Sequence, residues 1–426
     1  MEFNNPRGTR DFLFEDMDER RSIENSIRST FESYGFREVK TPIFEDLKLF
    51  TERSGEGIKN EIYHFQDKGN RDLALRPELT ASIARLYDNN LQKTAKPIKM
   101  YYYGSCFRYE RPQAGRFRQF WQFGCEVIGG NPIDSEAEIV SMANDALSKL
   151  NLDEYNIHIG HLGIIRGILN YFNIDSDNQQ KIIASIDKEE YDLLNNLLDE
   201  LSIDESDKQL IYKIVECKGS IDDLNDLKSY FNDIDECINA INNLIGILLR
   251  IEDFGFKDYV VDLSIARGLD YYTGFVFEIY VPSLGAEKQI TGGGTYNLNE
   301  MFNSEYIEST GFAIGFDRII EAYHRQNTPI NTDNTIDVLI IPLDQNLKSE
   351  AIKISQTLRK ENISVDIDFK GKKLKKNLSY ANIHNIPYVI IIGKKEVENN
   401  TVTIKDMNSG NQESITYNNI IKYIKK

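Results

Sequence analysis

The chain has 426 residues, enough for two or three domains with a large buried core, and its apolar and charged fractions of 41% and 27% are typical of a soluble globular protein. No apolar run approaches the ~20 residues of a membrane span and no signal peptide opens the chain, so we expect a cytoplasmic protein. The net charge of −17, taken over the whole chain, argues against a nucleic-acid partner.

The first predicted elements lead to a hairpin. Residues 16–34 place apolar side chains on one helical stripe, and Arg-Pro-Glu at 76–78 opens a second helix with an acid in its first turn. Residues 97–104 and 119–129 are two aromatic strands, and between them 111–118 form a turn-prone basic loop. These segments predict an antiparallel hairpin with a charged tip.

The second half of the chain changes character twice. Residues 173–250 are acidic and strongly helical, without a strand pattern, which predicts an inserted helical subdomain. Strands return from residue 258, and the polar stretch 326–334 is the best candidate for a linker. This division predicts a first domain over 1–325 and a small α/β domain over 335–426, in which strands and helices alternate.

Charge is distributed unevenly between these parts. Residues 335–426 hold 15 Lys and Arg against 10 Asp and Glu, a net charge of +5, so the rest of the chain carries −22. A basic domain on an acidic body is typical of a protein that binds a polyanion at one end. A lysine-rich surface without a partner is the alternative, and charge alone does not separate the two interpretations.

The predicted hairpin carries polar residues on one face. Because side chains alternate along a strand, Gln122, Gly124 and Glu126 share a face, and Arg108 and Glu110 share one on the preceding strand. The flanking sequence is apolar, and a buried charge is costly unless it is paired or binds a ligand. Gly124 leaves room for a ligand above the sheet. The pattern favours a binding site, with an internal ladder of salt bridges as the alternative.

Three further segments hold candidate functional residues. Residues 267–274 form a glycine-containing turn with an arginine and two tyrosines, which offers a fixed cation and phenolic hydrogen-bonding groups. Residues 292–296 form a glycine-rich bend that lacks the G-K-[ST] ending of a P-loop. Residues 311–318 run from a strand into a helix and place Arg318 on its first turn. The four cysteines and five histidines form no metal motif, so we predict no metal held by the chain itself.

Taken together, these segments resemble the class II aminoacyl-tRNA synthetases of the histidyl family over nearly the whole chain. The matching segments, first the three class II motifs and then those that histidyl enzymes combine, are 31–42, 107–126, 311–318, 7–12, 75–80 and 267–272. The resemblance implies an antiparallel sheet flanked by helices, with a helical insertion and a C-terminal α/β anticodon-binding domain. It also implies a homodimer through the first motif, ATP-dependent activation of histidine, and transfer of histidine to its tRNA.

The resemblance further implies roles for individual residues. Arg108 and Arg267 would be catalytic, flanking the α-phosphate of ATP. The implied histidine-binding residues are Glu78, Thr80, Arg108, Gln122, Glu126, Arg267, Tyr271, Tyr272 and Tyr296. The implied ATP-binding residues are Arg108, Glu110 and Arg318, with Mg²⁺ accompanying ATP. The implied tRNA-binding residues are Arg111, Gln113, Arg116 and Arg118.

The implied histidine site is chemically sensible. Glu78 and Thr80 would hold the α-ammonium group, while Glu126 and Tyr272 would hydrogen bond the two imidazole nitrogens. Such a site rejects apolar amino acids, because its buried polar groups would then stay unpaired. The lysines of 370–376 would face the anticodon, with a solvated helix face as the alternative.

The chain also departs from the family pattern. Thr295-Tyr296-Asn297 stands where the family usually has Arg-Tyr-Asp, so a charge pair is missing there, and the acidic insertion is a poor electrostatic match for RNA. One alternative is a catalytically silent regulatory subunit that senses histidine for ATP phosphoribosyltransferase, although such relatives lack the tail domain. The others are a synthetase for threonine or proline, which Glu126 with Tyr272 argues against, and an RNA-binding module without catalysis.

Overall fold

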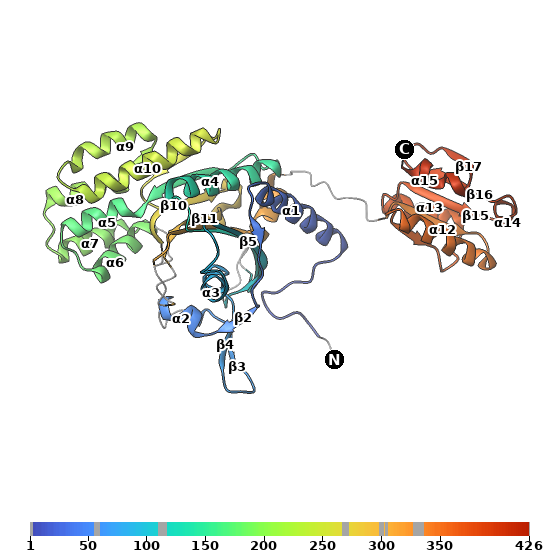
Figure 1. The fold of residues 1–426 in the computed structure, drawn as a ribbon, viewed down its shortest axis with the longest axis horizontal. Helices are drawn as coiled ribbons and strands as arrows, with labels where there is room; N and C mark the ends of the chain where they lie inside the picture. Colours follow the sequence, from blue (N-terminus) through green and yellow to red (C-terminus); the bar gives the residue numbers. More distant parts are fainter. Residues whose placement is uncertain are drawn as a thin grey trace. The chain divides into compact units, whose positions relative to one another are not determined.

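The structure is a computed structural model that describes residues 3–54, 60–109, 117–265, 272–297, 302, 306–326 and 336–425. The chain divides into two compact units, Met1–Ile330 and Asn331–Lys426, and each is described by itself (Figure 1). Of the predicted linker 326–334, only Gln326 belongs to the described residues. No helix in the described part of the chain has the length and apolar character to cross a membrane.

A nine-stranded sheet with the order β1-β5-β6-β12-β11-β10-β7-β9-β8 forms the centre of the first unit. Its antiparallel strands are β5 (Ile98–Phe107), β6 (Gln119–Ile128), β12 (Ser309–Gly315), β11 (Gln289–Tyr296), β10 (Tyr272–Tyr280) and β7 (Asn156–His161). Three short strands complete its edges: β1 (Arg37–Glu38), β9 (Val260–Asp262) and β8 (Lys218–Gly219). The predicted antiparallel sheet is confirmed, and its predicted hairpin is β5 with β6.

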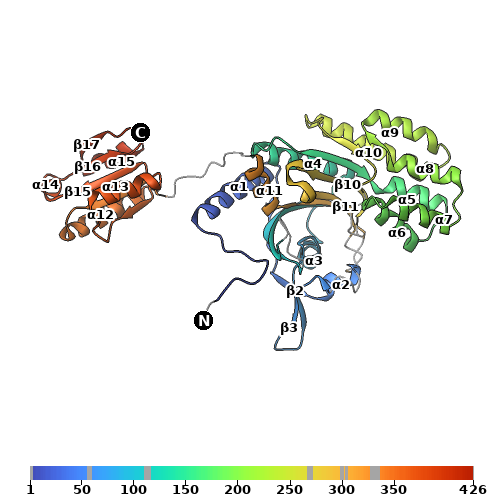
Figure 2. The ribbon, with the colours of Figure 1, turned by 180° about the vertical axis from the view of Figure 1, so that it is seen from behind.

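Helices cover both faces of this sheet. Figures 1 and 2 show α1, α4 and α11 on one side and α3 on the other. Their bounds are α1 (Phe14–Ser33), α3 (Thr80–Asn90), α4 (Pro132–Lys149) and α11 (Phe316–Gln326). Phe31 of α1 packs with Phe123 of β6 in the main core, while Ile83 of α3 packs with Tyr102 of β5 in a smaller one. The predicted helical stripe of 16–34 is thus confirmed as the buried side of α1.

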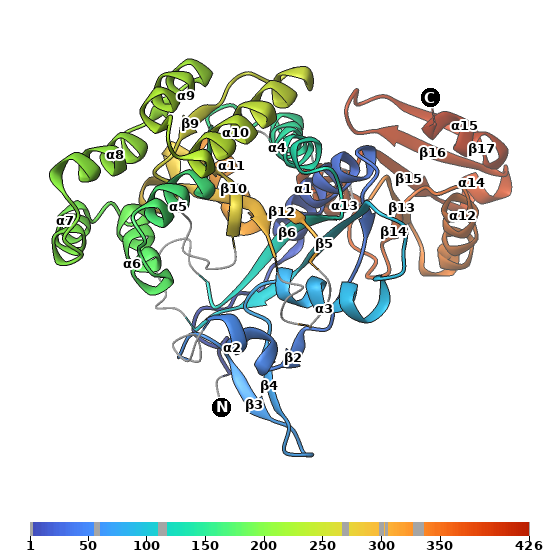
Figure 3. The ribbon, with the colours of Figure 1, turned by 60° about the vertical axis from the view of Figure 1, so that its left-hand side comes forward.

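A small three-stranded sheet leads into α3. It consists of β2 (Phe44–Asp46), β4 (Asp72–Leu75) and β3 (His64–Gln66), in the order β2-β4-β3, and α2 (Lys48–Ser54) follows β2. Figure 3 shows β3 and β4 projecting away from the large sheet. Phe50 and Ala74 pack with Ala81 of α3, so the small sheet fixes the segment from which α3 begins.

The helical insertion is mostly as predicted. Helix α5 (Leu162–Tyr171) precedes it. The helices of the insertion are α6 (Ser176–Asp187), α7 (Tyr191–Glu200), α8 (Glu205–Val215), α9 (Ile221–Lys228) and α10 (Asp235–Asp253). The expectation of no strand between 173 and 250 is wrong, because β8 pairs antiparallel with β9 and extends the large sheet. A two-residue strand is too short for side-chain alternation to reveal it.

The second unit is a mixed α/β domain with the strand order β14-β13-β15-β16-β17. The parallel strands are β14 (Val365–Ile367), β13 (Val338–Pro342) and β15 (Tyr388–Ile392), followed by the antiparallel β16 (Thr401–Asp406) and β17 (Gln412–Thr416). Its helices are α12 (Lys348–Lys360), α13 (Leu374–Ile383), α14 (Lys394–Glu398) and α15 (Ile420–Ile424). The alternation of strands and helices is confirmed as far as Ile392, where the predicted elements ended, and β16 and β17 were not predicted. β17 is mostly exposed and carries little apolar alternation, although β16 buries Val402 and Ile404 on one face.

Candidate active site

A buried carboxyl group lies at the centre of the large sheet. Glu126 of β6 is 1% exposed, and its two oxygens accept hydrogen bonds from Tyr102 Oη at 2.9 Å and Tyr296 Oη at 2.7 Å. Burial raises the pKa of Glu126 to about 8, although both hydrogen bonds act in the opposite direction. Side chains from β5, β6 and β11 therefore meet at the Glu126 carboxyl. Its raised pKa means that it readily takes up a proton, and it can also pair with a cationic ligand.

Two glycines make room for this arrangement. A Cβ atom at Gly311 would lie 1.8 Å from Glu126 Oε2, and one at Gly124 would lie 2.5 Å from Cε2 of the Tyr102 ring. Both positions therefore need glycine for a close approach. The room predicted above Gly124 exists, but the Tyr102 ring fills it, so the expectation that a ligand takes that space is wrong.

A second carboxyl group precedes α3. Glu78 accepts hydrogen bonds from the backbone N–H of Thr80 at 2.5 Å and of Ala81 at 3.0 Å, which ties it to the first turn of the helix. Burial raises the pKa of Glu78, and its negative charge in turn raises the pKa of Glu126. The Thr80 side chain lies close to Tyr102 and Glu126 and lowers the pKa of both. Two carboxyl groups and a hydroxyl group thus meet in one place, as expected for a site that binds a cation.

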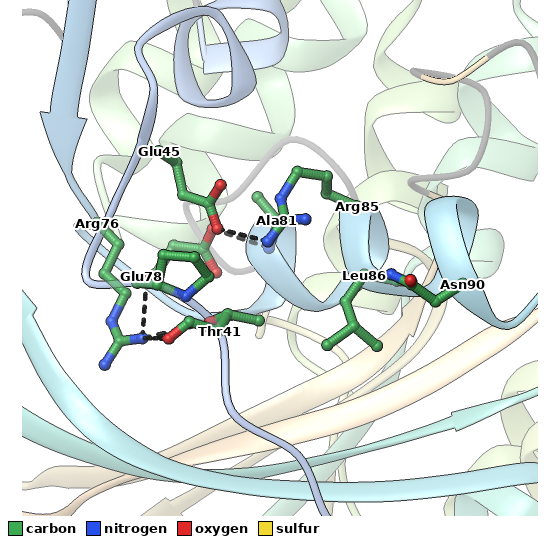
Figure 4. Close-up of polar contacts among 9 residues, drawn as sticks. Thr41, Glu45, Arg76, Glu78, Ala81, Arg85, Leu86 and Asn90 are labelled. Carbon is green, nitrogen blue, oxygen red and sulfur yellow. Dashed lines mark hydrogen bonds and ion pairs between the residues drawn. The ribbon is translucent and has the colours of Figure 1, made fainter.

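A buried arginine holds the segment before Glu78. Arg76 Nη1 donates to the carbonyl oxygens of Thr41 at 3.0 Å and Pro42 at 3.1 Å, and Arg76 Nε donates to the carbonyl of Ser105 at 2.8 Å (Figure 4). Gly104 lets the guanidinium group approach, since a Cβ there would lie 2.3 Å from Nη2. This arginine fixes the backbone leading to Glu78 against strand β5.

Two arginines mark one end of the sheet. Gln122 of β6 pairs with Gly104 of β5 and with Gly315 of β12, so β5 and β12, which lie on either side of β6, end at the same edge of the sheet. Arg108 follows the end of β5, and Arg318 follows the end of β12. Arg108 Nε donates to the carbonyl oxygen of Pro77 at 3.0 Å, and Arg318 Nη1 donates to that of Gln289. Arg108 also lowers the pKa of Glu78. Arg108 therefore lies close enough to Glu78 to act on its charge, and its guanidinium group could hold an anionic substrate group there.

The remaining described candidates lie as follows. Tyr272 and Tyr296 are register partners on β10 and β11, and both are 5% exposed. Gln122 Oε1 accepts a hydrogen bond from Cys106 Sγ at 3.3 Å. The Arg118 guanidinium lies 4.0 Å from the centre of the Tyr109 ring. The candidates Glu110, Arg111, Gln113, Arg116, Arg267 and Tyr271 lie outside the described residues.

The departure at Thr295 has a clear structural counterpart. Thr295 Oγ1 donates a hydrogen bond to Oε1 of Glu136 on α4, and both side chains are buried. Among the residues that the structure describes, Oε2 of Glu136 has no hydrogen-bond partner. Burial raises the pKa of Glu136 to about 8. The Glu136 carboxyl is therefore largely neutral near neutral pH, and it is hydrogen bonded to the hydroxyl group of Thr295, the residue before Tyr296.

Asp317 was not predicted as a functional residue. Its Oδ1 accepts hydrogen bonds from Arg10 Nη2 and Arg20 Nη1, both at 2.8 Å, and its Oδ2 accepts one from the backbone N–H of Trp121 at 2.9 Å. Asp317 directly precedes Arg318, so this carboxylate connects the N-terminal segment, α1 and β6 to the helix that carries the arginine. The sequence offered only the position beside Arg318 as a signal, because the partners are 196 to 307 residues away.

Comparisons with known proteins agree with this geometry. A family model described as Histidyl-tRNA synthetase matches residues 8–319, and one described as Anticodon binding domain matches 337–426. The chain is 46% identical to the histidine–tRNA ligase of Methanocaldococcus jannaschii, covering 97% of each chain, and 42% identical to that of Methanococcus maripaludis strain S2, covering 98% of this chain and 99% of the relative.

Solved structures are similar over the same length. The histidyl-tRNA synthetase of Nostoc sp. PCC 7120 gives a TM-score of 0.83 at 26% identity, covering 100% of this chain and 99% of that one. The apo S. aureus histidyl-tRNA synthetase gives 0.77 at 27% identity and covers all of both chains. The antiparallel sheet, its buried polar centre and the attached α/β unit define an aminoacyl-tRNA synthetase of class II. Within that class, the chain belongs to the histidyl-tRNA synthetase family.

Proposed function

We infer that this protein activates L-histidine with ATP and transfers it to the 3′ end of tRNA(His). The relatives that match nearly its whole length are named histidine–tRNA ligases. The observation that carries the inference is Glu126, a buried carboxyl group held between two tyrosine hydroxyl groups and close to a second carboxyl group, Glu78. Histidine carries an ammonium group and a ring N–H, and both can donate hydrogen bonds to these carboxyl groups.

The pocket suits histidine more than other amino acids. We propose that Glu126 and Tyr272 hydrogen bond the two imidazole nitrogens, while Glu78 and Thr80 hold the α-ammonium group. A leucine or valine side chain offers Glu126 no hydrogen-bond donor, so the carboxyl would keep only its two tyrosine hydrogen bonds and lose the one that histidine supplies. Gln122 lies on the same face of β6 as Glu126 and would hold the amino acid near its carboxylate, and Tyr296 lines the pocket.

Activation joins two anions, so catalysis rests on positioning and charge neutralisation. The histidine carboxylate oxygen forms a bond to the α-phosphorus of ATP, and the bond to the bridging oxygen breaks, releasing pyrophosphate. Arg108 and Arg318 lie at one end of the sheet, where they would hold the α-phosphate and the γ-phosphate. Arg267 and Glu110 keep their proposed roles at the α-phosphate and the adenine, and Tyr271 its place in the pocket.

Mg²⁺ would enter with ATP as a counter-ion of its phosphates. Among the described residues, no group of three or more His, Cys, Asp or Glu side chains could hold a metal ion. We propose that the metal acts with the ATP phosphates and takes no step of its own.

In the second step, a ribose hydroxyl of the terminal adenosine attacks the carbonyl carbon of the histidyl-adenylate, and AMP leaves. The basic loop with Arg111, Gln113, Arg116 and Arg118 would meet the acceptor end of the tRNA. We propose that 1–325 act as the catalytic domain, with 173–250 as its insertion, and that 335–426 bind the anticodon. A homodimer through 31–42 and a cytoplasmic location complete the proposal.

The experiment that tests this function is amino-acid-dependent exchange of pyrophosphate into ATP, with all twenty amino acids in parallel. Exchange with histidine alone is the expected result, followed by charging of tRNA(His). Exchange with a different amino acid would contradict the assignment of the pocket. A folded protein that binds histidine but exchanges no pyrophosphate would instead indicate the regulatory alternative, which the ligase relatives and the anticodon-binding match do not favour.

A further inference from the structure

One buried carboxylate in the second unit fixes the backbone of an exposed loop. Asp368 follows β14 and is 7% exposed. Its Oδ1 accepts hydrogen bonds from the backbone N–H of Lys370 and Gly371, both at 3.1 Å, and its Oδ2 accepts one from that of Lys372 at 2.8 Å. Asn377 Nδ2 donates to the same Oδ2 at 2.6 Å, which anchors the carboxylate to α13. The loop after β14 therefore has a defined shape.

This loop holds an aromatic ring out in solvent. Phe369 is 55% exposed, and its carbonyl oxygen accepts a hydrogen bond from Lys348 Nζ at 2.7 Å. Leu343, which follows the neighbouring parallel strand β13, is 56% exposed. A Cβ at Gly371 would lie 3.0 Å from Gln345 Nε2, so the two loops touch. Apolar side chains thus lie exposed at the carboxyl ends of two adjacent parallel strands.

The charges around this ring are mostly positive. The exposed lysines of the loop and the start of α13 are Lys370, Lys372, Lys373, Lys375 and Lys376. Of the acids nearby, Asp368 is satisfied by the loop backbone, and Asp344 caps the N–H of Asn346 and lies 4.0 Å from Lys394. An exposed flat ring beside several cations is complementary to nucleotides that are not base-paired, because their bases stack on aromatic rings and their phosphates attract lysine.

We propose that Phe369 is the stacking platform for one unpaired base of the anticodon loop, with Lys370 and Lys372 beside the adjoining phosphates. Asp368 is a positioning residue, since it acts only through the loop backbone. This proposal rests on the proposed function, which supplies tRNA as the partner, and it assigns the contact to the carboxyl-end surface made by 343–345 and 369–372.

Full-length Phe369→Ala tests the platform through the KM for tRNA(His). Loss of a stacked base is expected to raise that KM by between about 5-fold and about 150-fold. Histidine-dependent pyrophosphate exchange stays unchanged, because it does not involve the anticodon. Phe369→Trp keeps a stacking face and is expected to retain the wild-type KM. Ile383→Ala is the matched control, since Ile383 is an even more exposed apolar residue of the same unit, at 70%.

Direct binding to a hairpin RNA with the tRNA(His) anticodon stem and loop separates this surface from the enzyme's chemistry. Phe369→Ala is expected to weaken binding of that hairpin, but not of the same hairpin with an abasic loop. Lys370→Ala is expected to lower the salt dependence of binding by up to about 0.7 in the slope of log K against log salt. Asp368→Asn keeps Phe369, Lys370 and Lys372 but weakens the hydrogen bonds that fix the loop. It is therefore expected to raise the KM for tRNA(His) without changing histidine-dependent pyrophosphate exchange.

A KM for tRNA within twofold of wild type in Phe369→Ala overturns the proposal. A change of sedimentation behaviour in that variant, with an unchanged KM, would assign the surface to a protein contact and would equally overturn it. Failure of histidine-dependent exchange in the wild-type protein would contradict the proposed function instead, while the hairpin measurements would still decide the role of Phe369.

Discussion

At Glu126, burial and hydrogen bonding act on the carboxyl group in opposite directions. Burial raises its pKa, the donated hydrogen bonds from Tyr102 and Tyr296 lower it, and the balance lies at about 8. Near neutral pH, the free pocket therefore holds a largely protonated carboxyl. A ligand that brings a positive charge or a ring N–H favours the ionised form, so binding and deprotonation are coupled.

This coupling predicts how histidine binding depends on pH. The quantity to follow is the affinity of the wild-type protein for histidine divided by that of Glu126→Gln. This ratio is expected to rise by up to about tenfold per pH unit from pH 6 to about pH 8, and then to level off. Dividing by the variant at each pH removes the titration of the ligand itself. Calorimetry of histidine binding to both proteins makes the measurement, and a ratio independent of pH would show that Glu126 does not ionise on binding.

Residues differ in how far the sequence could predict their place. Alternation along β6 was enough to put Gln122 and Glu126 on one face, because a strand's period is fixed by its backbone. The partners of Glu126 could not be found this way. Tyr102 lies on the neighbouring strand and is one aromatic residue among several there, and only the register selects it. The sequence pattern therefore located the polar face but not the hydrogen bonds that set its chemistry.

At the scale of the element, α11 is held at its first turn. Asp317 joins this helix to Arg10, to Arg20 of α1 and to the backbone of Trp121 in β6. Asp317 and Arg20 side chains are 6% and 7% exposed, so this ion pair is shielded from solvent. Since Arg318 is the next residue, any rotation of the helix start would move the arginine that we assign to the γ-phosphate.

Asp317→Asn keeps the side-chain volume but leaves two guanidinium groups without their counter-charge. We expect it to lower the free energy of unfolding by about 3–5 kcal/mol and to raise the KM for ATP more than the KM for histidine. Glu321→Gln on the same helix is the control, because the Glu321–Arg325 pair is exposed and worth only about 0.3–0.5 kcal/mol. Urea unfolding and pyrophosphate exchange give both quantities, and equal changes in the two KM values would refute a specific effect on ATP.

Elements with a long periodic pattern were predicted well, and short ones were not. The stripe of α1 and the pair β5–β6 have enough residues for their periods to be recognised. Strand β8 has two residues and β17 is mostly exposed, so neither shows a period. The sequence also could not show that Asp317 reaches residues near the start of the chain, since such contacts follow from the packing of the whole sheet with its helices.

At the scale of the whole molecule, buried carboxyl groups shape the dependence of stability on pH. Glu136 has a pKa of about 8 in the folded chain, against an ordinary value of 4.5. Between these values the unfolded chain has lost the proton and the folded chain still holds it. The contribution of Glu136 to the free energy of unfolding is therefore expected to fall as pH rises from about 4.5 to about 8, and to level off above that.

Glu136→Gln isolates this contribution. The side chain at position 136 of the variant cannot ionise. The free energy of unfolding of the variant minus that of the wild type is therefore expected to increase between pH 5 and pH 8.5 by on the order of 3–5 kcal/mol. Glu200→Gln, an exposed position in the helical insertion, is the control and should show no such trend. Urea unfolding at the two pH values provides the comparison, and parallel curves for wild type and Glu136→Gln would exclude a neutral Glu136 in the folded chain.

The two glycines beneath the pocket restrict how its specificity could change in evolution. An added methyl group at Gly311 would collide with the Glu126 carboxyl, and one at Gly124 would collide with the Tyr102 ring. Neither glycine can therefore be replaced, even by alanine, without a collision, so these two positions cannot change the shape of the site in small steps. A lineage drifting toward another amino acid would have to begin at the walls, through substitutions in α3 or β10, where the bulk of a side chain can change in small steps.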